Sequence, residues 1–420
     1  MSSVNFLEKL LDGVLVEWIA LNSVCDFKNG FAFKSDRFKE SGLPIIRIAN
    51  IDGKIINLSE VKYFDPSDYK ENIESYMVIK GDILIAMSGA TTGKIGIYNF
   101  ESPAYLNQRV GKFVPKKNIL DRKYLYHYLL SKIEDIYILA GGGAQPNLSS
   151  NSLMNKIKIP IPCPENPEKS LEIQAEIVRI LDAMTAHTAE LTAELTLRKK
   201  QYNYYRDKLL IFEGIAIEYS PLGNDALGEF IRGGGLQKKD FTEVGVGCIH
   251  YGQIYTHYGT FAMETKTFVS QDFFEKARKA KFGDLVIATT SENDDDVCKA
   301  VAWLGAEDVA VSSDACIYRH KLNPKYVSYF FQTEQFQKQK KQYITGTKVR
   351  RVNANDLAKI LIPVPTLSEQ ARIVAILDKF DALTTSITEG LPREIELRQK
   401  QYEYYRDALL SFPKPTTINE

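Results

Sequence analysis

The sequence predicts an α/β protein made of two pseudo-symmetric α/β domains separated by two long, coiled-coil-like α-helices, in a circularly organised repeat. Three observations predict this fold class. Two helical motifs recur about 200 residues apart, apolar residues in both follow a heptad spacing, and short β-rich runs broken by turn residues lie between them. The length of 420 residues also exceeds what one ordinary domain needs.

The duplication is clearest in the helical motifs. Residues 174–182 read QAEIVRILD and residues 370–378 read QARIVAILD, an offset of 196. Residues 197–210 read LRKKQYNYYRDKLL and residues 397–410 read LRQKQYEYYRDALL, an offset of 200. Agreement of this many residues in the same order is not chance, so the chain contains a duplicated unit.

Fainter matches extend the duplication to the rest of each copy. They are IPIP at 159–162 with IPVP at 362–365, KGDILIA at 80–86 with FGDLVIA at 282–288, and GVLVEWIAL at 13–21 with GIAIEYSPL at 214–222. The last match places the first strand of each copy just after the tail of a helix. At the N-terminus that helix is reduced to a short piece at 6–11, while the second long helix ends the chain. We therefore expect a circular organisation with the two termini close together.

The long helices are predicted from a heptad seam. Mostly apolar positions alternate four and three residues apart from Ile177 to Leu209, with the polar residues Thr188 and Arg198 among them, which corresponds to a helix of about 33 residues and roughly 50 Å. The expected helix-core and partner-docking residues are Ile177, Leu181, Leu191, Leu195, Tyr202, Tyr205, Ile373, Leu377, Tyr402 and Tyr405.

The two helices differ in the middle. The first carries a TAEL tandem at 188–195, which we expect to act as a ruler, and the second is four residues longer. Gly390, Leu391 and Pro392 predict a break or kink there, because proline is tolerated only in the first turn of a helix.

Between these segments the sequence favours short strands and one helix per copy. Strands are expected at 44–48, 82–87, 284–289 and 310–318, and helices at 122–133 and 324–341. Proline pairs at 160 and 162, and at 363 and 365, mark extended entries into the long helices.

Composition excludes several classes. No apolar run approaches the roughly 18 residues of a membrane span, and the N-terminus lacks the pattern of a signal peptide, which predicts a cytoplasmic protein without membrane contact. The five cysteines are far apart, which favours buried, reduced thiols over a disulfide or metal role.

Net charge is zero, so any nucleic-acid contact must depend on local charge. Residues 338–351 carry six Lys or Arg and no acid, which suggests phosphate contact, although a solvated helix end and loop would look the same. The acidic residues at 292–296 lie elsewhere in the sequence and help restore the balance.

Catalytic motifs are missing. The SGATTGK loop at 88–94 lacks the first Gly and the final Ser or Thr of a phosphate-binding loop. The NPKY sequence at 323–326 departs from the NPPY signature of amino-methyltransferases, and no glycine-rich cofactor loop precedes it. The five histidines are scattered without a metal-ligand spacing. No catalytic residue and no metal site are predicted.

Polar loops on the duplicated frame remain. Arg or Lys suits guanine edges and phosphates, and Asn or Gln suits adenine. The candidate nucleic-acid contacts are Arg47, Asn50, Thr91, Thr92, Lys94, Gln108, Arg109, Gln145, Asn147, Lys238, Lys239, His250, Gln253, Lys348, Arg350 and Arg351. The loops of the two copies differ, which suggests one scaffold with two dissimilar recognition surfaces, although duplicated copies that had drifted without functional purpose would look the same.

These features together resemble the DNA-specificity subunit of type I restriction-modification systems. The resemblance depends on the QAxIVxILD and QYxYYRDxLL helices, the IPxP entries and the GDxLxA strands, and it covers nearly the whole chain. It implies two target-recognition domains, each reading one half of a bipartite, asymmetric double-stranded DNA site, with the two long helices antiparallel.

The resemblance also implies an organisation and partners. The expected segments are 1–16 near the C-terminal helix, recognition domains at 17–159 and 213–362, and helical spacers at 160–212 and 363–420. The helices would dock two methyltransferase subunits, and restriction subunits would join the complex. S-adenosylmethionine, ATP and Mg²⁺ would bind those partners, with no cofactor on this chain. A purely structural helical scaffold and a self-contained methyltransferase or nuclease are the alternatives.

Overall fold

The structure is a computed structural model of the chain, and it describes residues 11, 13–142, 146–212, 214, 216–386 and 388–413. The chain divides into two compact units. Unit 1 comprises residues 1–190 together with 396–420, and unit 2 comprises residues 191–395. The end of the chain thus returns to the unit formed by its beginning, as the circular repeat predicts.

Unit 1 contains two four-stranded sheets and a short antiparallel pair. The sheet orders are β2-β9-β6-β7, β4-β3-β8-β5 and β1-β10. The strand bounds are β1 Val16–Ala20, β2 Cys25–Asn29, β3 Leu43–Ile46, β4 Lys62–Phe64, β5 Met77–Val78, β6 Ile83–Ala86, β7 Ile95–Ile97, β8 Ala104–Leu106, β9 Val110–Pro115 and β10 Lys158–Pro162. Its short helices are α2 Leu21–Val24, α3 Arg122–Ser131, α4 Ile133–Leu139 and α5 Ser150–Lys156.

Unit 2 repeats this arrangement with added edge strands. The sheet orders are β12-β22-β18-β20-β15, β13-β16-β14-β21-β17, β11-β24 and β19-β23. The bounds are β11 Tyr219–Pro221, β12 Gly228–Arg232, β13 Phe241–Thr242, β14 Val246–Ile249, β15 Phe261–Ala262, β16 Thr267–Val269, β17 Lys279–Ala280, β18 Leu285–Ala288, β19 Thr290–Ser291, β20 Ala300–Trp303, β21 Val309–Val311, β22 Ala315–His320, β23 Arg350–Arg351 and β24 Leu361–Pro363. Its short helices are α7 Tyr251–Thr256, α8 Gln271–Lys276, α9 Pro324–Phe330, α10 Glu334–Lys341 and α11 Ala354–Leu357.

Two predicted elements are divided in the structure. The helix expected at 324–341 is α9 followed by α10, because the Thr333 side chain accepts from the backbone N–H of Phe336 and starts a new helix. The strand expected at 310–318 is β21 and β22 joined by the turn at 312–314. In unit 1, the helix expected at 122–133 ends at Ser131 and α4 begins at Ile133.

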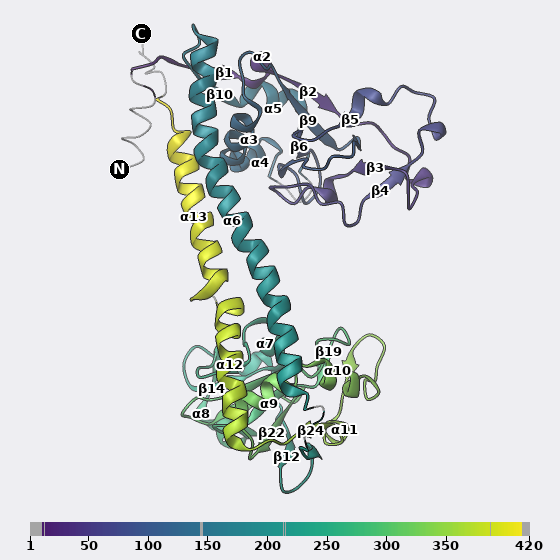
Figure 1. Cartoon of the computed structure of the whole chain (residues 1–420), viewed down its shortest axis with the longest axis vertical. Helices are drawn as coiled ribbons and strands as arrows, with labels where there is room; N and C mark the ends of the chain where they lie inside the picture. The colour runs from purple at the N-terminus through teal and green to yellow at the C-terminus, as the bar shows by residue number, and fades with distance from the viewer. Residues whose placement is uncertain are drawn as a thin grey trace. The chain divides into compact units, whose positions relative to one another are not determined.

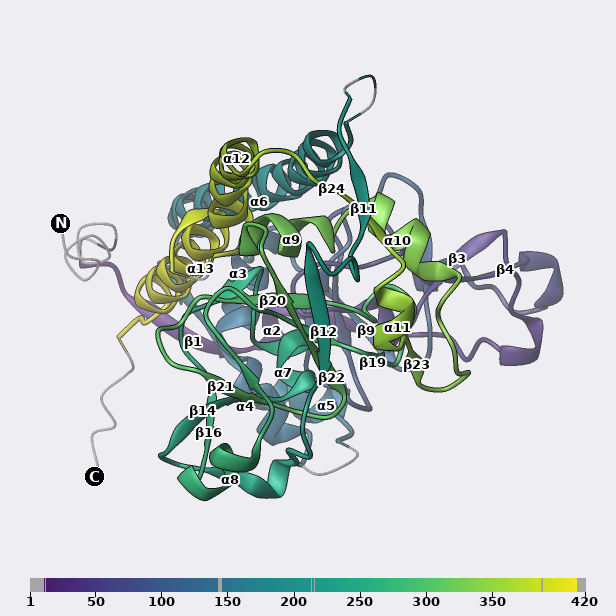
Figure 2. The ribbon, with the colours of Figure 1, turned by 90° about the horizontal axis from the view of Figure 1, so that it is seen from below.

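The long helices are α6 (Pro167–Leu210), α12 (Leu367–Thr385) and α13 (Gly390–Leu409). The predicted break is confirmed, since α12 ends at Thr385 and Pro392 is the third residue of α13. Within unit 1, the end of α13 runs antiparallel to the first part of α6, and within unit 2, α12 runs antiparallel to its last part (Figure 1 and Figure 2).

The two motif helices are packed into different units. Tyr402 and Leu409 of α13 share a core with Ile177 and Leu181 of α6 in unit 1. Tyr202 of α6 shares a core with Ile373 and Leu377 of α12 in unit 2. Close to the ends of the described chain, the Trp18 indole N–H donates to the Pro413 carbonyl at 2.9 Å. These contacts confirm the circular organisation. The short helix expected at 6–11 lies outside the described residues except for Leu11, which is buried in the unit 1 core.

The Gly-Asp pair that both copies carry before a buried strand has a structural explanation. Gly81 and Gly283 both have a φ of +88°, which favours glycine, and each precedes a buried aspartate. Asp82 accepts from the Ile79 N–H at 3.0 Å, and Asp284 accepts from the Lys281 N–H at 2.8 Å. The motif therefore closes a tight turn before the buried strands β6 and β18.

Candidate nucleic-acid interface

In unit 1, backbone hydrogen bonds bring three loops together. The Asn107 N–H, in the turn between β8 and β9, donates to the Ile46 carbonyl at 3.0 Å. The Arg109 carbonyl in the same turn accepts from the Met87 N–H at 2.9 Å, and the Met87 carbonyl accepts from the Leu148 N–H at 2.7 Å. These bonds hold the β8–β9 turn beside the end of β6 and the segment before α5.

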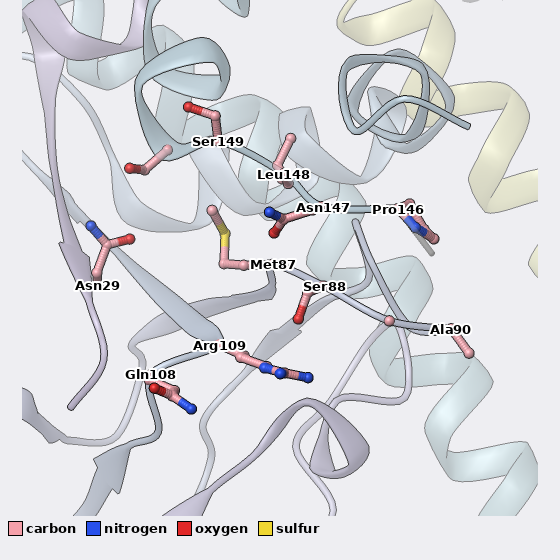
Figure 3. Close-up of a pocket in the computed structure, with 12 residues that line it drawn as sticks. Asn29, Met87, Ser88, Ala90, Gln108, Arg109, Pro146, Asn147, Leu148 and Ser149 are labelled. Atoms are coloured by element: carbon pink, nitrogen blue, oxygen red, sulfur yellow. The ribbon is translucent and has the colours of Figure 1, made fainter. Parts of the chain in front are cut away.

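These loops enclose a hollow of about 800 Å³. Three of the predicted contacts line it, namely Gln108, Arg109 and Asn147, together with Ser88 of the SGATTGK loop (Figure 3). Gln108, Arg109 and Asn147 are exposed, whereas the Ser88 hydroxyl is buried without a partner among the described residues. None of the described lining residues is acidic. The structure thus groups candidates that are distant in sequence, but Gln145 lies outside the described residues.

In the SGATTGK loop, the two threonines that are predicted to contact nucleic acid bond to the backbone instead. The buried Thr92 hydroxyl donates to the carbonyls of Gly89 and Pro146, at 2.6 and 3.1 Å. The Thr91 hydroxyl donates to the Ile48 carbonyl at 3.2 Å, while Lys94 is exposed. We therefore correct Thr92 to a residue that holds the loop, and Lys94 keeps the charge that suits phosphate.

A side-chain amide holds the same turn in both units. The Asn50 carboxamide oxygen accepts from the Arg47 N–H, and the Gln253 oxygen accepts from the His250 N–H, each at 3.0 Å. Asn50 is only 3% exposed and also donates to a backbone carbonyl, and Gln253 donates to the Thr267 hydroxyl. Because these amides are already used, we correct Asn50 and Gln253 from base contacts to turn-holding residues. Arg47 and His250, which start the two turns, stay candidates.

In unit 2, Lys238 and Lys239 are exposed on a short 3-10 helix at Lys238–Asp240. Burial, and secondly the charge of Lys238, lower the pKa of His250 below its usual value. The imidazole is therefore neutral at pH 7, with Nδ1 accepting from the Gly252 N–H at 3.2 Å.

The basic stretch at 338–351 is not a single exposed cationic surface. Lys340 is 1% exposed, and its ammonium donates to the carbonyls of Asp294, Asp295 and Val297 at 2.8, 3.1 and 2.9 Å. The Arg350 guanidinium forms a 2.7 Å ion pair with the Asp294 carboxylate. The acidic run, which is distant in the sequence, therefore lies beside part of the basic stretch in the fold.

Four members of the basic stretch remain exposed, namely Lys338, Lys341, Lys348 and Arg351. Lys348 and Arg351 lie in and after the loop that leads into β23, which pairs with β19. Whether Lys348, Arg350 and Arg351 contact DNA stays a prediction, now with Arg350 already paired to a carboxylate.

Comparison with known proteins decides the family. The model of the "Type I restriction modification DNA specificity domain" family matches residues 14–198 and 227–397. A type I restriction enzyme specificity subunit of Escherichia coli is 35% identical over the full length of both chains. The chain belongs to the type I restriction-modification DNA-specificity family.

Further relatives agree with this assignment. A putative type I specificity subunit of Haemophilus influenzae is 32% identical over 97% of this chain and 98% of that protein. The fold matches the S subunit of a type I system from M. genitalium with a TM-score of 0.52 at 14% identity, covering 96% of this chain and 98% of that one. A solved chain from a study of type I complex assembly matches with a TM-score of 0.61 at 15% identity, covering 94% and 98%. These structures show the same fold, and the family assignment makes the protein a DNA-specificity subunit.

Sequence reasoning missed a polar cluster that fastens α13 to unit 1 of this specificity subunit. His127 is buried, with Nε2 3.0 Å from an Asp182 oxygen and Nδ1 2.9 Å from the Tyr402 hydroxyl. In unit 2 the equivalent aspartate, Asp378, accepts from the Tyr329 hydroxyl at 2.7 Å. The aspartate of the ILD motif was visible as a repeated residue, but its role needed the fold.

The glutamine of the QAxIVxILD motif has the same role in both units. The buried Gln174 oxygen accepts from the Asp121 N–H, and the buried Gln370 oxygen accepts from the Asn323 N–H, each at 2.8 Å. Asp121 and Asn323 cap α3 and α9. The motif glutamine therefore joins each long helix to its own domain.

The expected helix-core residues differ in their burial. Ile177, Leu181, Tyr202, Ile373, Leu377 and Tyr402 are buried, Leu191, Leu195 and Tyr405 are half-buried, and Tyr205 is 39% exposed while stacking on Phe380 at 5.7 Å. The seam is thus tightly packed at the ends of the helices.

Other chemistry is not indicated. Among the residues that the structure describes, no group of three or more His, Cys, Asp or Glu could hold a metal ion. The five cysteines are buried and unpaired, and burial raises the pKa of Cys25 and Cys298 to about 12. No helix of the described part is long and apolar enough to cross a membrane.

Proposed function

We propose that the two units contain the two target-recognition domains, at 17–159 and 213–362, and that each reads one half of a bipartite, asymmetric double-stranded DNA site. The observation that carries this proposal is the contrast between equivalent loops on one duplicated frame. The loop after β6 borders a polar hollow without acidic lining among the described residues, whereas the loop after β18 carries carboxylates next to Arg350. Different surfaces on one frame suit two different half-sites.

The helices are proposed to set the spacer and to dock two methyltransferase subunits. Leu197 and Tyr204 of α6 are 65% and 57% exposed, and their counterparts Leu397 and Tyr404 of α13 are 44% and 63% exposed. Each Leu–Tyr pair is seven residues apart, so it lies on one helix face. Exposed apolar and aromatic residues repeated in both copies support a repeated protein contact. Restriction subunits would then join this complex.

Reconstitution with the methyltransferase subunits tests the docking. Leu197→Glu should remove one bound methyltransferase subunit, measured as the mass of the complex, and Lys200→Glu on the same helix should not. Unchanged stoichiometry in Leu197→Glu would place the docking surface elsewhere.

Footprinting and methylation mapping of the reconstituted complex test the reading of DNA. We expect protection and methylation at one bipartite sequence with an unread spacer. A complex that assembles without sequence-specific protection would instead support a purely structural scaffold, and methyl transfer by the isolated chain would support a self-contained enzyme.

A further inference from the structure

The turn between β21 and β22 occupies the same place in unit 2 as the β8–β9 turn in unit 1. The Ser312 N–H donates to the Ile249 carbonyl at 3.2 Å, as Asn107 does to Ile46. The Asp314 carbonyl accepts from the Thr289 N–H at 2.9 Å, as Arg109 does from Met87. Asn107 and Ser312 each form a parallel bridge to the residue two positions after an equivalent strand, to Phe31 after β2 and to Gly234 after β12. The two turns are therefore equivalent positions of the duplicated frame.

The tip of each of these equivalent turns carries one charged residue, and the two charges are opposite in sign. Gln108 and Arg109 form the tip in unit 1, and Ser313 and Asp314 form it in unit 2. Arg109 is exposed and Asp314 is partly exposed. Within the described part of the chain, neither charged group has a hydrogen bond or an ion pair, in contrast to Asp284, which is 3% exposed and bound to Arg319. A charged group without a hydrogen bond or ion pair in the fold is available to a ligand.

The neighbouring residues suit a carboxylate that approaches DNA. The Tyr251 N–H donates to the Ser312 hydroxyl at 2.9 Å, and the Phe241 ring lies 5.9 Å from the His250 ring. The turn at 312–314 and the segment that carries Lys238 therefore both lie beside His250. His250 begins the turn that corresponds to the Arg47 turn, and Lys238 and Lys239 are exposed nearby. The exposed charges of Lys238 and Lys239 in this segment offset part of the repulsion between the acid and phosphates.

We propose that Arg109 and Asp314 are equivalent base-reading residues, Arg109 recognising a guanine in one half-site and Asp314 the amino group of a cytosine in the other. A guanidinium donates two N–H groups that match O6 and N7 of guanine in the major groove, and a carboxylate accepts from N4 of cytosine. The inference rests on the proposed function of the two units.

The test uses the specificity subunit reconstituted with its methyltransferase subunits and duplexes in which each base pair of the mapped site is varied in turn. Arg109→Gln should reduce discrimination at one G·C pair of the first half-site by about 5- to 150-fold, and leave the second half-site unchanged. Asp314→Asn should do the same at one pair of the second half-site only. Glu307→Gln removes an exposed acid from unit 2 and should change neither.

The readout separates this inference from the proposed function. A ratio of affinities for two duplexes does not depend on the fraction of folded protein, so loss of stability cannot imitate relaxed reading. Full discrimination in Asp314→Asn or in Arg109→Gln, or relaxation in both half-sites, would overturn the assignment. A wild-type complex without sequence preference would instead refute the proposed function before any variant is compared.

Discussion

Replacing Lys340 by Met should destabilise unit 2. The ammonium is 1% exposed and donates to three backbone carbonyls of the loop that carries the acidic residues. Burial lowers the pKa of this ammonium, whereas the nearby acidic groups raise it. Met fills a similar volume but donates nothing, so the carbonyls lose their partner.

The expected cost follows from what happens to each carbonyl. Asp294 and Asp295 are exposed, so water can replace the ammonium there, but Val297 is buried. A hydrogen bond to a charged group contributes about 1.5–3 kcal/mol, and a buried unsatisfied group costs about 1–3 kcal/mol. We expect a loss of roughly 2–4 kcal/mol in the free energy of unfolding of unit 2, or about 4–16 °C in its melting temperature.

The two tryptophans provide the assay. Trp18 lies in unit 1 and Trp303 is buried in unit 2, so a Trp18→Phe background leaves a reporter of unit 2 alone. Urea unfolding followed by Trp303 fluorescence should shift to a lower midpoint in Lys340→Met, and not in Lys341→Met, which replaces an exposed lysine. Equal midpoints in the two variants would refute the role given to Lys340.

Three further predictions concern stability, DNA affinity and spacing. Burial lowers the pKa of His320 to about 4, so below pH 6.5 the unfolded chain binds a proton that the folded chain does not. The free energy of unfolding should therefore fall by roughly 3 kcal/mol between pH 6.5 and 4. His320→Gln should flatten that part of the pH profile of urea unfolding, and an unchanged profile would contradict the lowered pKa. Lys348→Ala with Arg351→Ala should weaken binding to all duplexes and lower the salt slope by about two, and an unchanged slope would mean that these exposed cations do not contact phosphates. A third TAEL unit inserted after Leu195 would lengthen the continuous helix α6 by about 6 Å and turn it by about 40° beyond a full turn. Methylation mapping should then show both half-sites unchanged and a spacer longer by one or two base pairs. An unchanged spacer would show that α6 does not set the spacer length.

The parts of the fold that depend on local pattern could be predicted from the sequence. The repeated motifs placed α6, α12 and α13, and Pro392 placed the interruption between the last two. The apolar runs after Gly-Asp gave β6 and β18, whose residues are all buried. Hydrophobic spacing and secondary-structure propensity depend on residues close together in the sequence, so these elements could be predicted from it.

The candidate site depended on contacts between distant segments, and here the sequence was less informative. The partners of Lys340 lie more than 40 residues before it, so its burial could not be seen. Asn50 and Gln253 fit base reading by residue type, but the fold uses both amides in turns. The stretch 310–318 is predicted as one strand because both of its ends are apolar. The prediction therefore misses the turn at 312–314, which contains Asp314.

Exchange of one recognition domain tests the central claim most directly. Residues 17–158 would be replaced by the corresponding segment of a family member with another target, and the complex reconstituted with methyltransferase subunits would be mapped by methylation. The account predicts a new sequence in one half-site, with the other half-site and the spacer unchanged. A change in both half-sites, or in neither, would contradict the assignment of one half-site to each unit.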